Sequence, residues 1–273
     1  MSSRSQLCVQ LRDCATVDKV LALVGKDEVN RLYLELGSES RLGILRALKV
    51  KDYKMRELGR HLGLTATEAF RQVKRLTEAQ LIQRLPEGSY TITPYGRLVL
   101  QLSSAHEFTF RNREYFSNHD LSRLPLQFVS RIGELSGASL SMDAVHNVNK
   151  GMQMVITAKA YFWGMVEEEG SSLLGPAAAE RMRTGVKYRF LLPESLHLPD
   201  TRPLGTAQSL AVRRLPDIPL IMGITEKEVG VFFRFIGGRA DYAGFVAEDQ
   251  TSIDWAHDLF MHYWEKAASS RTI

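Results

Sequence analysis

The stretch that decides the fold is TATEAFRQVKRLTEAQLIQRLPEGSYTIT, which runs from Thr65 to Thr93. Thr65 and Glu68 have the spacing of a capping box, in which each side chain accepts a hydrogen bond from a free amide at the start of a helix. A helix over 66–79 should follow, with polar and basic side chains on one face. Its apolar residues, which predict the packed face, are Ala69, Phe70, Val73 and Leu76.

A short β-hairpin is predicted directly after this helix. Residues 81–85 form its first strand, and Pro86-Glu-Gly-Ser89 contains residues that favour a turn. Residues 90–93 alternate apolar and polar side chains, as a returning strand does. Pro94 then ends the sheet and begins a further helix, which we expect to extend to about Phe116.

Two more helices are predicted before residue 65. Ser38 is a candidate N-cap for the first, and the second covers residues 54–62. Gly63 follows the second helix as a glycine at the C′ position does. Three helices and a hairpin are the order of a winged helix-turn-helix domain, which we assign to 38–97. The apolar residues that predict the packed face of the first helix are Leu42, Leu45 and Leu48.

Basic residues are concentrated in this predicted domain. Residues 38–97 contain 12 Lys and Arg against 6 Asp and Glu, a net charge of +6. Residues 1–37 contain 5 of each sign, and residues 98–273 contain 18 basic and 20 acidic residues, a net charge of −2. A local excess of positive charge on a nearly neutral chain is typical of a module that binds a polyanion.

Double-stranded DNA is the polyanion that these elements predict. The third helix would lie in the major groove, where arginine bonds guanine, glutamine bonds adenine and the threonine methyl contacts thymine. The hairpin and the start of the second helix would contact phosphates. A charged helix face is common on other proteins too, so the prediction depends on the ordered set of elements. The expected DNA-binding residues are Lys54, Arg56, Thr65, Thr67, Arg71, Gln72, Lys74, Arg75, Arg84 and Tyr90.

The rest of the chain divides into three parts. Residues 1–37 are expected to form a helical extension, and residues 98–124 a connecting helix and linker. Residues 125–268 are expected to form a mixed α/β domain, so the fold class is a winged helix followed by an α/β body. The predicted strands of that body are 138–142, 186–192, 209–215, 218–224, 229–236 and 242–247, and its predicted helices are 143–168, 176–184 and 252–268.

Two parts of the sequence resemble known families. Residues 45–96 resemble the winged helix of archaeal regulators related to the arsenic-repressor group, in which a T-x-x-G motif and a dimerising helix follow the wing. Thr93-Pro-Tyr-Gly96 matches that motif. The C-terminal part resembles the middle domain of methanogenesis regulatory proteins. Together the resemblances imply a dimeric, archaeal-type transcription regulator. The stretches that carry the second resemblance are 186–193, 224–228, 238–245 and 255–264.

An enzyme is the first alternative for the C-terminal domain. Residues 179–192 also resemble the phospholipase D-like fold, which suggests a hydrolase or nuclease tethered to DNA. That chemistry needs His-x-Lys, and none of the 7 histidines is followed two residues later by lysine. Motifs of other hydrolases, nucleotide-binding loops and zinc proteases are absent as well. Asp254, His257, Asp258 and His262 share a predicted helix, but the two histidines lack the spacing of a metal face. We therefore expect no catalysis, no cofactor and no metal site.

A small-molecule sensor is the use that the sequence favours for this domain. Aromatic side chains close to polar groups are typical of ligand pockets. Two alternatives to a ligand pocket remain. The aromatic side chains can simply pack in the core while the charged ones form surface ion pairs, or the domain can serve only as an assembly scaffold. The candidate ligand-binding residues are Tyr188, Arg189, Phe233, Asp241 and Trp255.

The expected partners are double-stranded DNA, a second copy of the chain and a small effector. A homodimer is expected because two half-sites are needed for a long operator, and the helix after Pro94 and the N-terminal helices are its predicted interface. No apolar run approaches the ~20 residues that span a bilayer, and the N-terminus lacks a signal peptide, so we expect a cytoplasmic protein. Cys8 and Cys14 match no zinc or redox motif, which predicts reduced thiols, with a redox switch as the alternative.

Overall fold

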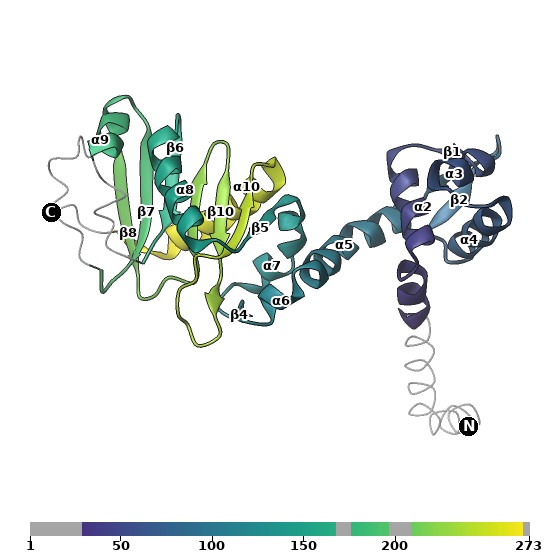
Figure 1. Ribbon diagram of the computed structural model, residues 1–273, viewed down its shortest axis with the longest axis horizontal. Coiled ribbons are helices and arrows are strands. Elements are labelled where there is room, and N and C mark those ends of the chain that lie inside the picture. The colour runs from purple at the N-terminus through teal and green to yellow at the C-terminus, as the bar shows by residue number, and fades with distance from the viewer. Residues whose placement is uncertain (1–28, 168–175, 197–208, 270–273) are drawn as a thin grey trace, which may run out of the picture. The chain divides into compact units, whose positions relative to one another are not determined.

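The computed structural model describes residues 29–167, 176–196 and 209–269, and the chain divides into two compact units, Met1–Leu102 and Ser103–Ile273 (Figure 1). The boundary falls inside one long helix, α5 (Pro94–Arg111). The sequence places the start of the C-terminal body near Pro125 instead. The predicted and observed boundaries differ because Phe108 and Tyr115, which lie within the predicted linker, are buried in the core of the C-terminal unit.

The N-terminal unit has its helices and its hairpin in the order that the sequence predicts, and it has one further strand, Tyr53–Lys54, that was not predicted. Its helices and strands are the helical residues 29–36, α2 (Glu39–Val50), β1 (Tyr53–Lys54), α3 (Met55–Leu62), α4 (Ala66–Glu78), β2 (Ile82–Arg84) and β3 (Ser89–Ile92). The three strands form an antiparallel sheet of order β1-β3-β2. Residues 1–28, including Cys8, Cys14 and most of the predicted extension, lie outside the described residues.

Local signals set the ends of these helices. Gly63 follows α3 with φ +66°, the left-handed conformation that glycine adopts at low cost. The Thr65 hydroxyl accepts a hydrogen bond of 3.2 Å from the amide of Glu68 and so caps α4. The predicted capping box is only half formed. The Glu68 carboxylate instead accepts a hydrogen bond of 3.4 Å from the Ser40 hydroxyl, which joins α4 to α2.

One apolar core holds the N-terminal unit together. It joins the inward faces of α2, α3 and α4 to the hairpin and to the start of α5. Two predicted residues of the first helix, Leu45 and Leu48, are fully buried, whereas Leu42 packs at the edge. The buried residues of this core are Ile44, Leu45, Ala47, Leu48, Leu58, Val73, Leu76, Leu81, Ile82, Ile92, Val99 and Leu100.

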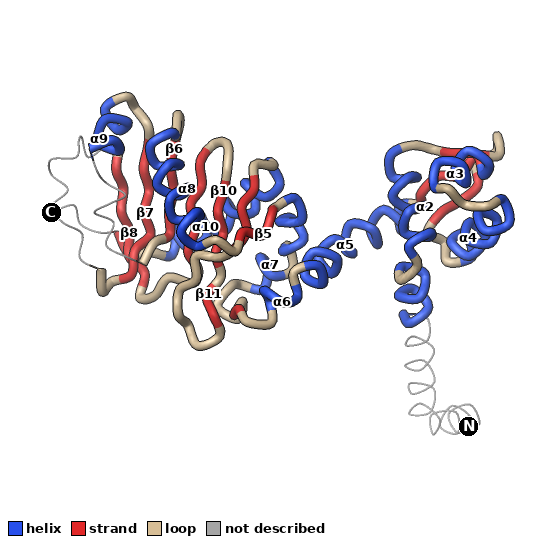
Figure 2. Tube along the Cα trace, in the orientation of Figure 1, coloured by secondary structure: helices blue, strands red, loops and turns tan. Residues whose placement is uncertain are grey.

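The C-terminal unit is a mixed α/β domain (Figure 2). Its elements are α6 (Arg113–Phe116), β4 (His119–Asp120), α7 (Leu126–Val129), η2 (Ile132–Gly137), β5 (Ser139–Ser141), α8 (Ala144–Thr157), β6 (Tyr161–Met165), α9 (Pro176–Arg183), β7 (Lys187–Pro193), β8 (Leu210–Leu215), β9 (Ile221–Thr225), β10 (Val229–Phe232), β11 (Arg234–Phe235), β12 (Gly244–Ala247), α10 (Gln250–Lys266) and β13 (Ala268–Ser269).

An eight-stranded sheet of order β13-β8-β7-β6-β9-β10-β12-β5 forms the centre of this unit. β6, β7 and β8 are parallel, and the remaining pairs are antiparallel. Successive side chains of a strand point to opposite faces, so Phe190 packs with α8 and α9, and Leu191 packs with α10. The sheet therefore has a separate apolar core on each face.

One predicted element of this unit is wrong. The helix expected over 143–168 ends at Thr157, and residues 161–165 form the central strand β6. The Glu226 carboxylate accepts hydrogen bonds from the amides of Lys159 and Ala160, at 3.0 and 3.3 Å, and so holds the chain where the helix has ended. The aromatic run Tyr161-Phe-Trp favours a strand, although a helix was predicted there.

None of the helices of the described residues is both long enough and apolar enough to cross a membrane.

Candidate nucleic-acid interface

The outer face of α4 carries a stripe of four exposed side chains, Thr67, Phe70, Arg71 and Lys74, and continues to the exposed Glu78, whose carboxylate is 3.9 Å from the Lys74 ammonium. They are three or four residues apart, and such positions are neighbours on a helix surface. The opposite face is buried and comprises Ala69, Gln72, Val73 and Leu76. The polar and basic stripe predicted for this helix is therefore present, but it differs from the prediction at three positions, since it lacks Gln72 and Arg75 and includes Phe70.

Gln72 is the first difference. Its side chain faces inward and is only 7% exposed, and its amide oxygen accepts a hydrogen bond of 2.8 Å from Nη1 of Arg41 on α2. A side chain held in this way cannot reach a base edge, so the predicted contact between Gln72 and adenine is wrong. Because α4 is oriented with the Gln72 side chain in the core, the Phe70 side chain points outward, although it was predicted to be in the core.

Arg75 is held by an acidic residue that lies outside the predicted domain. Its Nη2 donates a hydrogen bond of 2.7 Å to the Glu35 carboxylate, and its Nε donates to the same group. Arg41 forms an ion pair with the same carboxylate, 2.8 Å between Nε and Oε2, and its Nε donates a hydrogen bond of 3.0 Å to the backbone carbonyl of Glu35. Glu35 itself is buried, so this carboxylate ties the helical residues 29–36 to both α2 and α4.

The pKa values of the two arginines reflect their different surroundings. The hydrogen bond to Glu35 raises the pKa of Arg75 above its usual value. Burial lowers the pKa of Arg41, and this outweighs the attraction of Glu35, while Arg75 and Arg71 nearby act in the same direction as burial. Arg75 keeps 45% of its side chain exposed, so a phosphate can still approach it, but its guanidinium is primarily a structural group.

Lys54 and Arg56 at the start of α3 are both exposed, as predicted. The backbone amide of Lys54 already donates a hydrogen bond of 3.1 Å to the Glu57 carboxylate. This amide is therefore not free for a phosphate, so a DNA contact in this region stays a prediction for the two cationic side chains. The Thr65 hydroxyl caps α4, so Thr65 has a structural role beside any contact with DNA.

The hairpin β2–β3 carries the two predicted wing residues opposite each other, Arg84 and Tyr90. Arg84 is exposed, and it lies beside the turn, where Gly88 has φ +91°. Tyr90 is half-buried, packs against the core and also pairs with Tyr53 on β1. The side chain of Arg84 is thus accessible, and its contact with a phosphate stays a prediction, whereas the ring of Tyr90 mainly supports the sheet.

The Thr93-Pro-Tyr-Gly96 motif fixes the hairpin to its neighbours. The Thr93 hydroxyl donates a hydrogen bond of 2.7 Å to the carbonyl of Gln80 and accepts one of 2.9 Å from the amide of Gly96. A Cβ at Gly96 would lie 2.1 Å from the carbonyl oxygen of Leu81, so only glycine fits this approach. The motif therefore sets the position of the hairpin relative to α4.

The predicted ligand-binding residues of the C-terminal unit do not form a common pocket. Tyr188, Phe233 and Trp255 are almost fully buried. Tyr188 lies in the core on the α8 face of the sheet, and the other two lie in the core on the α10 face. The Tyr188 hydroxyl donates a hydrogen bond of 2.7 Å to the carbonyl of Val155, and burial raises the pKa of Tyr188 to about 12. These aromatics serve core packing.

Arg189 and Asp241 have separate partners. The Arg189 guanidinium lies over the rings of Trp163 and Trp264, at 4.7 and 5.3 Å from their centroids. The Asp241 carboxylate is 2.9 Å from Nε2 of the buried His119. A surface depression of about 370 Å³ involves none of the five predicted residues. It is lined by Asn118, Phe235, Ile236, Gly237 and Arg239.

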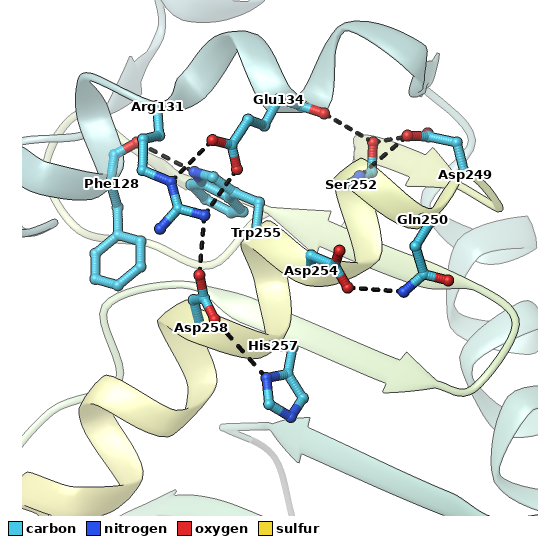
Figure 3. A network of polar contacts seen from close by, with 10 residues as sticks. All are labelled: Phe128, Arg131, Glu134, Asp249, Gln250, Ser252, Asp254, Trp255, His257 and Asp258. Atoms are coloured by element: carbon cyan, nitrogen blue, oxygen red, sulfur yellow. Dashed lines mark hydrogen bonds and ion pairs between the residues drawn. The ribbon is translucent and has the colours of Figure 1, made fainter.

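Some polar contacts of α10 lie within the helix, and others fasten it to the segment 128–137 (Figure 3). Asp258 accepts a hydrogen bond of 2.9 Å from Arg131, and Asp254 accepts one of 2.7 Å from Gln250. Indole Nε1 of Trp255 donates a bond of 3.2 Å to the carbonyl of Phe128. Within residues 29–167, 176–196 and 209–269, no group of three metal-ligating side chains comes together.

Comparisons with known proteins give distant structural matches. No protein-family model matches the sequence, and no curated protein matches it. The solved structure of TrmBL2, an archaeal chromatin protein that shows a novel mode of DNA binding, is 15% identical, covers 88% of this chain and 99% of its own, and has a TM-score of 0.38. The transcriptional regulator MosR of M. tuberculosis is 18% identical, covers 40% and 84%, and has a TM-score of 0.27.

A third match belongs to the phospholipase D family, the enzyme class that the sequence offers as an alternative for the C-terminal domain. NUC from Salmonella typhimurium, a phospholipase D family member, is 10% identical, covers 46% of this chain and 91% of its own, and has a TM-score of 0.36. Such distant likenesses assign no function to this chain. The resemblance to the arsenic-repressor group stays a prediction.

Proposed function

We propose that the protein is a transcription regulator that binds double-stranded DNA through the outer face of α4. One observation carries the proposal. Thr67, Arg71 and Lys74 form an exposed polar and basic stripe on a helix whose other face is buried, within a segment of net charge +6. A helix of this kind enters the major groove, where arginine bonds guanine and lysine meets phosphate. Arg84, Lys54 and Arg56 add cationic contacts to the backbone.

Binding of the full-length chain to duplexes selected from a random library tests this proposal. The logarithm of the association constant should fall linearly with the logarithm of the salt concentration. Lys74→Ala should weaken binding to all DNA sequences alike and should reduce the magnitude of that slope by about 1. Arg71→Ala should cost about 1–3 kcal/mol on the selected site and relax the preference at one base pair. Lys187→Ala, which removes an exposed lysine of β7, is the matched control. Equal behaviour of all three variants would contradict the proposal.

We infer further that the chain pairs through α5. Tyr95, Leu98 and Leu102 are exposed apolar side chains three or four residues apart on one face of that helix. Pairing two copies along this face would give two recognition helices for two half-sites. Sedimentation of the full chain should show a dimer, and the double variant Leu98→Lys, Leu102→Lys should be a folded monomer with weaker operator binding. A wild-type monomer with full operator affinity would contradict the pairing.

The C-terminal unit is proposed to be non-catalytic and to regulate or assemble the dimer. The sequence has no His-x-Lys for phospholipase D chemistry, so we expect no hydrolysis of bis(p-nitrophenyl) phosphate above background. Sensing of a metabolite stays a prediction. A metabolite that raises the melting temperature by mass action and also changes operator affinity supports sensing, and a screen without such a metabolite favours assembly.

A further inference from the structure

Phe70 is an exposed aromatic side chain in the middle of the basic stripe of α4. It is 57% exposed, while Ala69 before it and Gln72 two residues after it are buried. The rotation of α4 that exposes it is set by the buried contacts of Gln72 and of Arg75 on the other side of the helix. Phe70 therefore occupies a fixed outward position and is not a loosely placed core residue.

The surroundings of Phe70 restrict what its ring can contact. Thr67 is one turn before it, Arg71 is adjacent and Lys74 is one turn after it, so a partner that meets the ring also meets two cations. A phenyl ring has no hydrogen-bonding group for a base edge or a phosphate. The 5-methyl group of thymine is the apolar group that a base pair presents in the major groove.

On the basis of the proposed function, we propose that Phe70 is a specificity-determining residue that contacts the 5-methyl group of thymine in the operator. The early residues of a recognition helix are those that contact base edges, and Phe70 is the fifth residue of α4. The contact distinguishes A·T from G·C at the position beside the one that Arg71 contacts. The operator therefore contains a thymine next to the base pair recognised by Arg71.

Deoxyuridine provides a direct test, because it keeps every hydrogen-bonding group of thymine and lacks only the methyl group. The full-length chain is titrated with its selected duplex and with duplexes in which single thymines are replaced. Removing one contacted methyl should cost about 0.8 kcal/mol, which is about fourfold in Kd. Phe70→Ala should bind the thymine and uracil duplexes equally. Phe110→Ala, which removes a 71% exposed ring of α5, should keep the fourfold difference.

Each other outcome overturns the proposal. A wild-type chain that binds both duplexes equally shows that no methyl is contacted, while the salt slope and the Arg71→Ala result still report on DNA binding itself. Discrimination that survives in Phe70→Ala assigns the methyl contact to another residue, and a selected site made only of G·C pairs excludes a thymine contact. A chain that binds no duplex refutes the proposed function and this inference together, and favours a protein partner for the ring.

Discussion

The side chains of Arg41 and Gln72, 31 residues apart in the sequence, are joined by a buried hydrogen bond of 2.8 Å. Arg41 also binds the Glu35 carboxylate, and Glu35 binds Arg75. Two residues of α4 are therefore held from the core side of the helix. Since a helix has one rotational setting, these contacts also decide that Arg71 and Phe70 face outward.

The first prediction concerns Gln72→Ala. The substitution removes the acceptor of a buried guanidinium N–H, which should destabilise the N-terminal unit by about 1–3 kcal/mol. Hydrogen exchange of the α2 and α4 amides measures this loss. The order of preference among duplexes should not change, in contrast to Arg71→Ala. A changed base preference without a loss of hydrogen-exchange protection would show that Gln72 contacts DNA instead.

A larger effect is expected for Glu35→Ala. The buried Arg41 loses its counter-ion, and the loss of one partner of a buried pair costs about 3–5 kcal/mol. The protection of the α2 and α4 amides from hydrogen exchange should fall accordingly, and the amides of residues 29–36 should lose their protection. Glu265→Ala, at an exposed position of α10, should change stability by less than about 0.5 kcal/mol. Similar protection in both variants would show that Glu35 is not a structural link.

Two glycines should respond to alanine in opposite directions. The new methyl of Gly96→Ala would lie 2.1 Å from the carbonyl oxygen of Leu81 and meets backbone, so the hairpin or the start of α5 must move and the N-terminal unit should be destabilised. Gly151 lies within α8 and has open space around it, so Gly151→Ala should stabilise by about 0.5–1 kcal/mol. Chemical denaturation followed by circular dichroism measures both, and a neutral Gly96→Ala would refute the steric argument.

His262 should make the stability of the C-terminal unit depend on pH. Burial lowers the pKa of His262, with Lys266 acting in the same direction and Glu265 in the opposite one. Its neutral form is favoured on folding, so the stability it contributes is complete above the unfolded pKa of about 6.5 and decreases as the pH falls below that value.

Tryptophan fluorescence measures this dependence, because all 3 tryptophans of the chain, Trp163, Trp255 and Trp264, belong to the C-terminal unit. The melting temperature of His262→Gln should fall less between pH 7.5 and pH 5.5 than that of the wild type. His146→Gln, at an exposed position of α8, should behave like the wild type. An unchanged pH dependence in His262→Gln would show that protonation of this ring is not coupled to folding.

The sequence by itself determined the order of the helices and the hairpin in the N-terminal unit, whereas the short strand β1 was not predicted. The boundaries of the helices and the hairpin are set by signals that act over a few residues, so they can be recognised without the fold. They are the helix cap Thr65, the glycine after α3, the turn before Ser89 and the alternation of the hairpin. The same local signals located most strands of the C-terminal unit. The prediction failed at Tyr161–Met165, because the periodicity of an apolar run after a helix does not separate a continued helix from a buried strand, and the aromatic residues there were the one local signal for a strand.

Tertiary structure alone decided which residues form the candidate interface. Helical periodicity identifies an apolar face, but Phe70 and Gln72 lie at its border, where either residue can turn inward. The choice was made by Arg41 and Glu35, which lie 31 and 40 residues away from their partners Gln72 and Arg75. Likewise, the aromatics predicted to bind a ligand entered two separate cores because strand pairing, not sequence spacing, assigns each side chain to a face of the sheet.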